Sequence, residues 1–124
     1  MIKIAVSSGD PAGIGPDICI KAFGQKKIYD FSPVIFGDKE LFKSRARTLG
    51  INADIQIYKG QEELSNDSLW IANRDCDLNI LPGKPDPNCA NFIISNFQQA
   101  VKRTISKEFE AVVTCPINKE IINK

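Results

Sequence analysis

Two short loops contain residue types and spacings that suit the binding of an anionic ligand. The first covers residues 7–16 and contains glycines at positions 9, 13 and 15. Glycine permits positive φ and lets a backbone approach a ligand closely. The helix expected to begin at Pro16 would point unpaired N–H groups and the positive end of its dipole at a phosphate or carboxylate. From this loop we select Asp10, Gly13 and Gly15 as residues that bind substrate or cofactor.

The second loop covers residues 114–119 and directly follows an expected strand. Thr114 and Asn118 can hydrogen-bond a ligand, and we assign both to substrate or cofactor binding. Lys119 can hold an anion or carry a proton, and we assign it the catalytic role. The alternative for this segment is an exposed turn with a solvated lysine.

The first loop matches no common nucleotide-binding fingerprint. Ile18 stands where the dinucleotide motif has its third glycine, and no Gly-Lys-Ser/Thr follows as in a Walker sequence. A tight structural turn is therefore an equally good interpretation of residues 7–16 taken alone. In that alternative the Asp10 side chain caps its own turn.

Alternating strands and helices predict an α/β domain with a largely parallel sheet. The expected strands cover residues 2–7, 33–37, 54–58, 78–81 and 111–115. Helices are expected after Pro16, after an Asp38 cap, after an Asp86 cap and after Pro116. The helix after Asp38 should run to about Leu49 and end at Gly50. Residues 59–77 are expected to form an irregular loop pinned by Leu69, Trp70 and Ile71.

The apolar residues of the expected helices predict which helix faces meet the core. On the first helix they are Ile18, Ala22 and Phe23. On the long helix after Asp86 they are Ala90, Ile93, Ile94, Phe97, Ala100, Val101 and Ile105. Four basic residues are expected on solvated helix faces: Arg45, Arg47, Lys102 and Arg103.

The bulk composition narrows the function classes. Sixteen basic and fifteen acidic residues give a formal net charge of +1, which argues against a dedicated nucleic-acid surface. No apolar run approaches the roughly 18–20 residues that span a bilayer, so we expect a cytosolic protein. The absence of histidine excludes a Ser-His-Asp triad and a histidine metal site built from these residues alone. The four cysteines, at 19, 76, 89 and 115, are expected to be buried free thiols.

Three segments together resemble a known family. Residues 9–16 (Gly-Asp-Pro-Ala-Gly-Ile-Gly-Pro) resemble the opening signature of 4-hydroxythreonine-4-phosphate dehydrogenases. Residues 114–120 (Thr-Cys-Pro-Ile-Asn-Lys-Glu) resemble that family's strand-to-helix segment, and residues 83–85 (Gly-Lys-Pro) its turn before a long helix. The resemblance runs through the whole chain in the right order and spacing.

The resemblance implies an α/β/α layered fold similar to isocitrate and isopropylmalate dehydrogenases, in a cytoplasmic homodimer of two-domain subunits. It also implies a small phosphorylated substrate, NAD or NADP as cofactor, and a divalent zinc, magnesium or cobalt ion. Such enzymes oxidise 4-phosphooxy-threonine to 2-amino-3-oxo-4-phosphooxybutanoate. That product decarboxylates to 3-amino-2-oxopropyl phosphate in the biosynthesis of vitamin B6 (pyridoxal phosphate).

The chain departs from the family in two respects. The family's metal-binding histidines and a Gly-His-Thr-Glu segment lie beyond the position of Lys124, so we expect residues 1–124 to be the amino-terminal α/β portion of a longer dehydrogenase. The metal would then be bound by residues outside this chain, and the chain alone would be inactive. Cys115 also replaces the usual alanine or glycine, which could make the site sensitive to oxidation.

Two alternatives stay open. One is a related dehydrogenase of four-carbon sugar-acid phosphates such as 4-phospho-erythronate, because most substrate contacts would lie downstream. The other is a non-catalytic anion- or nucleotide-binding module. For the protein as a whole we expect no membrane partner and no nucleic-acid partner.

Overall fold

A computed structural model describes residues 2–25, 30–60, 63–65 and 67–116. Its centre is a five-stranded sheet in which every neighbouring pair of strands is parallel. The strands are β1 (Ile2–Ser7), β2 (Phe31–Gly37), β3 (Ile55–Ile57), β4 (Leu69–Asn73) and β5 (Ala111–Thr114). They lie in the order β3-β4-β2-β1-β5, which confirms the predicted α/β class with a parallel sheet.

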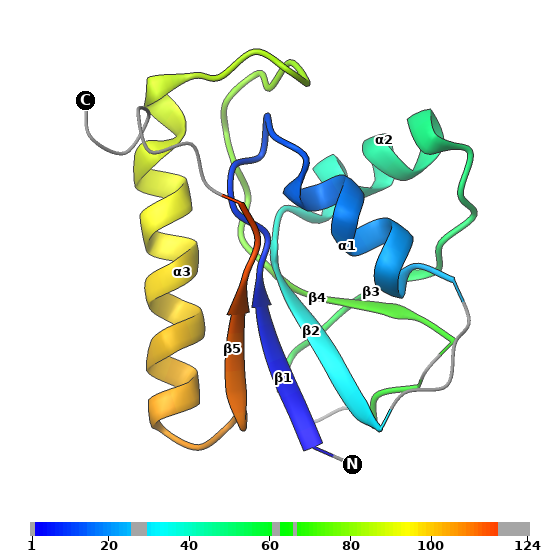
Figure 1. Ribbon diagram of the computed structural model, residues 1–124, viewed down its shortest axis with the longest axis vertical. Helices are drawn as coiled ribbons and strands as arrows, with labels where there is room; N and C mark the ends of the chain where they lie inside the picture. Colours follow the sequence, from blue (N-terminus) through cyan, green and yellow to red (C-terminus); the bar gives the residue numbers. More distant parts are fainter. Residues whose placement is uncertain (1, 26–29, 61–62, 66, 117–124) are drawn as a thin grey trace.

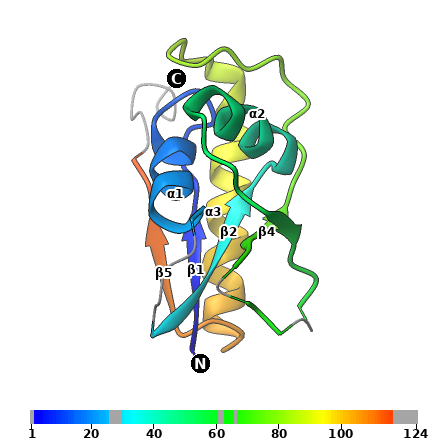
Figure 2. The same cartoon turned by 90° about the vertical axis from the view of Figure 1, so that its right-hand side faces the viewer.

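Three α-helices complete a layered α/β/α arrangement. They are α1 (Gly15–Phe23), α2 (Lys39–Leu49) and α3 (Ala90–Ile105), the last preceded by the short 3-10 turn η1 (Pro87–Cys89). Helices α1 and α2 lie together on one face of the sheet, and α3 lies on the other (Figures 1 and 2). None of the helices in the described ranges is long and apolar enough to cross a membrane.

The core is divided by the sheet into two layers because neighbouring strand residues point to opposite faces. Val6, Ile35 and Ile71 pack with α1 and α2. Ala5, Val34 and Ala72 pack on the α3 side, together with the rings of Tyr58 and Phe109. Both faces of the sheet are covered, which explains why the central strands are continuous apolar runs.

Local capping signals decide where α2 begins and ends. The Asp38 carboxylate accepts hydrogen bonds from the N–H groups of Glu40 and Leu41, at 2.9 and 3.4 Å. Gly50 closes the helix with a left-handed φ of 70°, which glycine adopts without steric cost. Asp86 similarly accepts from the N–H of Asn88 before α3. These three predicted caps are confirmed.

Two predictions about strands were wrong. Residues 69–73 are not part of a loop: β4 pairs with β2 on one side and with β3 on the other. Residues 78–81 form no strand; Leu78 and Ile80 instead pack against Cys89 and Ile93. Both segments are short apolar runs, and a short run can fill a strand position or cover a helix equally well.

The predicted helix faces were also partly wrong. In α1 the buried side chains are Cys19 and Ile20, whereas Ile18 is 42% exposed. In α3 the buried face consists of Phe92, Ile93, Asn96 and Ala100. Ile94, Phe97 and Ile105 are exposed on its outer side. The face of α3 that packs on the sheet therefore differs from the face that the apolar residues alone predict, because it includes the polar residue Asn96.

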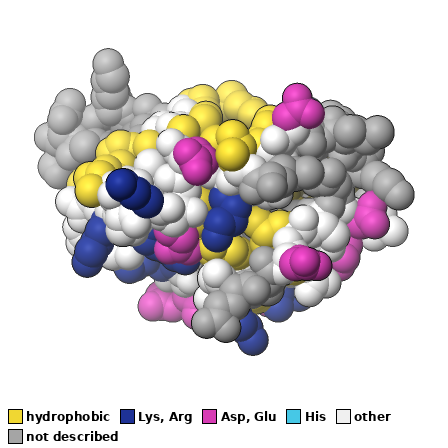
Figure 3. Space-filling model, turned by 90° about the horizontal axis from the view of Figure 1, so that it is seen from below, with side chains coloured by type: hydrophobic (Ala, Val, Ile, Leu, Met, Phe, Trp, Pro, Cys, Tyr) yellow, Lys and Arg dark blue, Asp and Glu magenta, His cyan; other side chains and the backbone are white. Residues whose placement is uncertain are grey.

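All five strands point the same way, so their carboxyl ends gather at one end of the molecule (Figure 1). Ligands of open α/β sheets bind beyond this end. Figure 3 looks at the opposite end and shows basic and acidic side chains interspersed there. That end therefore presents no surface of a single charge.

Candidate functional site

The sheet changes its direction of winding between β1 and β5. From β1 the chain moves to β2 and on to β3 at the edge, places β4 between β3 and β2, and then returns to place β5 on the other side of β1. A crevice at such a reversal is the usual ligand-binding position in open α/β sheets. Ser7, the last residue of β1, pairs with Thr114, the last residue of β5. Both loops selected from the sequence therefore begin at the reversal.

Direct backbone contacts hold the two loops together. The Cys115 N–H donates a 2.9 Å hydrogen bond to the Ser7 carbonyl. Gly9 has φ of 74°, and a Cβ atom there would collide with the Pro116 carbonyl oxygen. A side chain at Gly9 would thus separate the loops. Segments more than 100 residues apart in sequence meet at one point of the fold.

Gly15 is required because of a close approach of the backbone. It is buried as the first residue of α1, and a Cβ atom on it would collide with the Ser8 carbonyl oxygen and lie 3.1 Å from Cβ of Cys115. The N-cap residue Ile14 makes no side-chain hydrogen bond to the first turn. The amino terminus of α1 consequently lies beside the second loop without a capping side chain, which suits a bound anion.

Asp10 builds the turn of the first loop. Its carboxylate is 4% exposed and accepts a 2.9 Å hydrogen bond from the Ala12 N–H. Its carbonyl accepts another of 2.9 Å from the Gly13 N–H. This is the capping role weighed as the alternative for Asp10. Contact of Asp10 and Gly13 with a ligand stays a prediction.

Arg45 reaches this loop from α2 and lies buried at 5% exposure. Its Nε donates to the Asp17 carboxylate at 2.9 Å, and its Nη1 donates to the Pro11 carbonyl at 2.9 Å. Its Nη2 donates to the Gly13 carbonyl. The Arg45 guanidinium therefore binds both the first loop and the first turn of α1 and fixes their position relative to α2.

The prediction that Arg45 is solvated was wrong, and the sequence held a signal against it. Arg45 is four residues after Leu41 and four before Leu49, next to Phe42 and Ala46 in the apolar stripe of α2. A charged residue on such a stripe points inward and needs buried partners. The backbone carbonyls of the loop are those partners.

A buried hydroxyl lies where the two loops begin. Ser7 is fully buried, and its Oγ has no hydrogen-bond partner among the described residues. Buried polar atoms are normally paired, so an unpaired one calls for an explanation such as an absent ligand or water. The sequence analysis placed Ser7 at the end of a strand and in the first loop, but it did not select the residue for binding.

The second loop is described only as far as Pro116. Thr114 is exposed at the end of β5, where its hydroxyl can meet a ligand. Asn118 and Lys119 lie outside the described residues, so their predicted roles stay predictions. The turn at residues 82–85 also meets the site, since the Gly83 N–H donates a 2.8 Å hydrogen bond to the Ala12 carbonyl.

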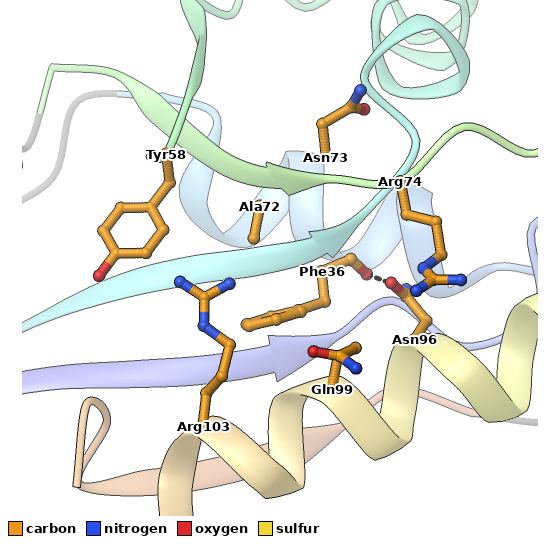
Figure 4. A pocket seen from close by; sticks show the side chains of 8 residues that line it. All are labelled: Phe36, Tyr58, Ala72, Asn73, Arg74, Asn96, Gln99 and Arg103. Carbon is orange, nitrogen blue, oxygen red and sulfur yellow. Dashed lines mark hydrogen bonds between the residues drawn. The ribbon is translucent and has the colours of Figure 1, made fainter. Parts of the chain in front are cut away.

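A second hollow of about 200 Å³ lies between β4 and α3. Figure 4 shows Asn96, Gln99 and Arg103 extending from α3 toward the sheet, with Arg74 at the end of β4. The Arg103 guanidinium donates to the Glu108 carboxylate at 2.8 and 2.5 Å and lies 5.3 Å from the ring centre of Phe36. Arg103 was predicted to be solvated, and that prediction was wrong. The charge of Arg103 is matched by Glu108, and the hollow does not lie at the reversal of the sheet, so we favour the two loops as the candidate site.

The chain was compared with known proteins. A family model described as "Pyridoxal phosphate biosynthetic protein PdxA" matches residues 30–124. A 4-hydroxythreonine-4-phosphate dehydrogenase of Pseudoalteromonas atlantica is 30% identical over 99% of this chain and 38% of its own length. That of Saccharophagus degradans is 33% identical over 98% of this chain and 36% of its own length.

Solved structures show the same fold. A crystal structure of 4-hydroxythreonine-4-phosphate dehydrogenase from Klebsiella pneumoniae superposes with a TM-score of 0.89 at 22% identity, covering 99% of this chain and 39% of that one. A terephthalate 1,2-cis-dihydrodiol dehydrogenase from Burkholderia xenovorans gives a TM-score of 0.78 at 22% identity, covering 98% of this chain and 36% of that one. The chain thus spans little more than a third of the proteins it matches.

Proposed function

The chain belongs to the pyridoxal phosphate biosynthetic protein PdxA family, and on that premise we propose that it works as the amino-terminal part of a longer dehydrogenase. The proposed reaction is NAD(P)-dependent oxidation of 4-phosphooxy-threonine to 2-amino-3-oxo-4-phosphooxybutanoate, which decarboxylates to 3-amino-2-oxopropyl phosphate. The names of the relatives, 4-hydroxythreonine-4-phosphate dehydrogenases, support this substrate. We further propose a cytoplasmic homodimer.

One observation carries the proposal for this chain's own residues. The loops at the ends of β1 and β5 are joined by the 2.9 Å hydrogen bond between Cys115 and Ser7. They meet at the reversal of the sheet, where ligands of such folds bind. The two segments that resemble the dehydrogenases therefore lie together at one position of the fold.

The first loop and α1 would bind a negatively charged group of the substrate or cofactor. The uncapped amino terminus of α1 supplies N–H donors and a positive dipole end. Arg45 donates hydrogen bonds to the Pro11 and Gly13 carbonyls, which keeps the backbone of the first loop preorganised. A preformed site binds without a further entropy cost for ordering the loop.

The second loop would supply side-chain groups. The Thr114 hydroxyl can donate to or accept from the substrate. We propose that Asn118 hydrogen-bonds the substrate or cofactor. Lys119 carries a proton or binds an anionic oxygen. NAD or NADP, when bound, accepts the hydride, so these residues need only bind, orient and move a proton.

The described residues of this chain offer no site that fits a divalent metal. The sequence contains no histidine. Within the described ranges, no three Cys, Asp or Glu side chains come together as a metal site would require. If zinc, magnesium or cobalt takes part, its ligands come from elsewhere in the protein. We therefore derive no step from the metal.

The proposal is tested by measuring nucleotide reduction by the full-length protein. NAD and NADP are each offered with 4-phosphooxy-threonine and with 4-phospho-erythronate, before and after treatment with a chelator. The expected result is reduction with 4-phosphooxy-threonine that the chelator abolishes and added metal restores. A preference for 4-phospho-erythronate would instead support the related activity on sugar-acid phosphates. No reduction with either substrate would contradict both dehydrogenase activities and support the non-catalytic binding module.

A further inference from the structure

Cys19 of α1 and Cys115 at the end of β5 place their sulfur atoms 3.5 Å apart, although 96 positions separate them in sequence. Cys115 belongs to the second loop, and Cys19 lies in the helix that the first loop introduces. We propose that these two thiols form an oxidation site, in which a peroxide or a small disulfide converts them to a disulfide that links α1 to β5 beside the crevice.

The geometry favours this pair because little movement is needed. A disulfide requires a sulfur–sulfur distance of about 2.05 Å, so the two atoms must approach by roughly 1.5 Å. Both side chains lie in the same apolar cluster with Val6 and Ile20. Cys19 is fully buried and Cys115 is 8% exposed. Of the two residues, Cys115 is therefore the less deeply buried and the first that a water-sized oxidant such as hydrogen peroxide is expected to meet.

The two sulfurs are also chemically unequal. Either sulfur can donate to the other across 3.5 Å. A hydrogen bond from Cys19 lowers the pKa of Cys115, and the same contact, with burial, raises the pKa of Cys19. Cβ of Cys115 also lies near Gly15, at the positive end of α1, which favours a thiolate. We assign Cys115 the role of attacking thiolate because it lies beside the start of α1 and, unlike Cys19, is not completely buried. Cys19 is then the resolving thiol.

The reaction balances in two steps. The Cys115 thiolate attacks hydrogen peroxide, its sulfur takes one oxygen, and the O–O bond breaks to release hydroxide. The Cys19 sulfur then attacks the sulfenic acid, the S–O bond breaks, and the oxygen leaves as water. Two thiols lose two electrons and two protons, and one peroxide becomes two molecules of water. With a small disulfide as oxidant, thiol exchange gives the same product and two small thiols.

The other two cysteines provide an internal comparison. Cys76 and Cys89 each contribute to the shifted pKa of the other. Burial is the largest cause that raises the pKa of Cys89, to about 12, and it also raises the pKa of Cys76. Neither thiol is favoured as a thiolate, so this pair is expected to oxidise more slowly.

The effect on ligand binding rests on the proposed function. Closing the sulfurs pulls the first turns of α1 toward the end of β5, where the two loops of the proposed site meet. The disulfide therefore narrows the site and is expected to raise KM for the anionic substrate. The oxidation itself does not depend on the identity of that substrate.

The test uses the full-length protein treated with increasing hydrogen peroxide, quenched with a thiol alkylator and digested without reductant. We expect a peptide pair joined at Cys19 and Cys115, about 2 Da lighter than the sum of the reduced peptides and released by dithiothreitol. It should appear at lower peroxide than any product at Cys76 or Cys89. C115A and, independently, C19A should abolish it, whereas the matched control C76A should leave it unchanged.

Several results would overturn the proposal. They are earlier oxidation of Cys76 and Cys89, a Cys115 sulfinic acid without a linked peptide, or unmodified Cys19 and Cys115 at peroxide levels that oxidise the other pair. The mapping needs no activity, so it stands even if the proposed dehydrogenase reaction is wrong. If the linked peptide forms but KM is unchanged, the site exists and its proposed effect on binding is refuted.

Discussion

The Arg45 guanidinium donates a 2.9 Å hydrogen bond to the Asp17 carboxylate, and through this pair α2 holds the start of α1. The same guanidinium also binds the carbonyls of Pro11 and Gly13. The first loop is therefore held by a residue outside it. Asp10, the charged side chain of the loop itself, cannot replace this contact because its carboxylate accepts hydrogen bonds, as it does from the Ala12 N–H.

Replacing Arg45 with methionine is expected to destabilise the protein by about 2–3 kcal/mol. Methionine keeps the apolar stem but leaves the Pro11 and Gly13 carbonyls and the Asp17 carboxylate without their donor. Urea unfolding of Arg45→Met, with Arg47→Met as the matched control, measures the difference. Arg47 is exposed on the same helix, so its variant should change stability by less than about 0.5 kcal/mol. Equal stability of both variants would contradict the role given to Arg45.

The two glycines of the same loop should differ in their tolerance of alanine. A Cβ atom at Gly15 collides with the Ser8 carbonyl, whereas one at Gly13 lies 3.4 Å from Cβ of Asp10, an ordinary contact. Gly15→Ala should therefore cost roughly 2 kcal/mol, and Gly13→Ala less than about 0.5 kcal/mol. Thermal or urea unfolding of both variants checks this order. Reversal of the order would mean that the approach of Gly15 to Ser8 is not as the structure has it.

Stability should depend on pH through Glu108. The Arg103 guanidinium, followed by the Tyr58 hydroxyl, lowers the pKa of Glu108 below its ordinary value of 4.5. A carboxyl whose pKa is depressed by folding stabilises the fold above its unfolded pKa. The stabilisation disappears as the pH falls through the lower folded pKa. Glu108→Gln should thus cost about 1 kcal/mol at neutral pH, after allowance for partial exposure, and nothing at strongly acidic pH.

Urea unfolding from neutral to acidic pH gives the measurement. Glu110→Gln is the matched control because Glu110 is exposed nearby. A constant difference between Glu108→Gln and the parent at all pH values would refute the linkage.

Lys119→Ala should lower turnover of the full-length protein about 100-fold without lowering its unfolding midpoint. The expectation follows from the proton-carrying role proposed for Lys119 in the second loop. Steady-state kinetics with 4-phosphooxy-threonine, with Lys102→Ala as control, measure it. Lys102 is exposed on α3. Kinetics of Lys119→Ala close to those of the parent would remove Lys119 from the site.

Features determined by neighbours in sequence could be predicted. The Asp38 and Gly50 caps of α2 depend on a few adjacent residues, and both were identified. The parallel sheet follows from the alternation of apolar runs with amphipathic segments. The meeting of the two loops follows from the rule that carboxyl ends of parallel strands share one edge.

Features determined by distant packing could not be predicted in the same way. Residues 69–73 form an interior strand because β2 pairs with them on one side and β3 on the other. The sequence of the segment itself does not show that these partners exist. Asn96 turns the buried face of α3 because its Nδ2 donates to the Phe36 carbonyl at the end of β2. The approach of Cys19 to Cys115 depends on how α1 sits on the sheet. Each of these requires knowledge of a partner far away in the chain.

Hydrogen–deuterium exchange of the full-length protein, with and without nucleotide and 4-phosphooxy-threonine, tests most directly whether the two loops form the binding site. Ligands are predicted to slow exchange together in peptides covering residues 7–17 and residues 111–116. Peptides covering the exposed end of α3, residues 101–106, should not change. Protection confined to residues 70–74 and 96–103, around the second hollow, or absent from residues 7–17, would contradict the account.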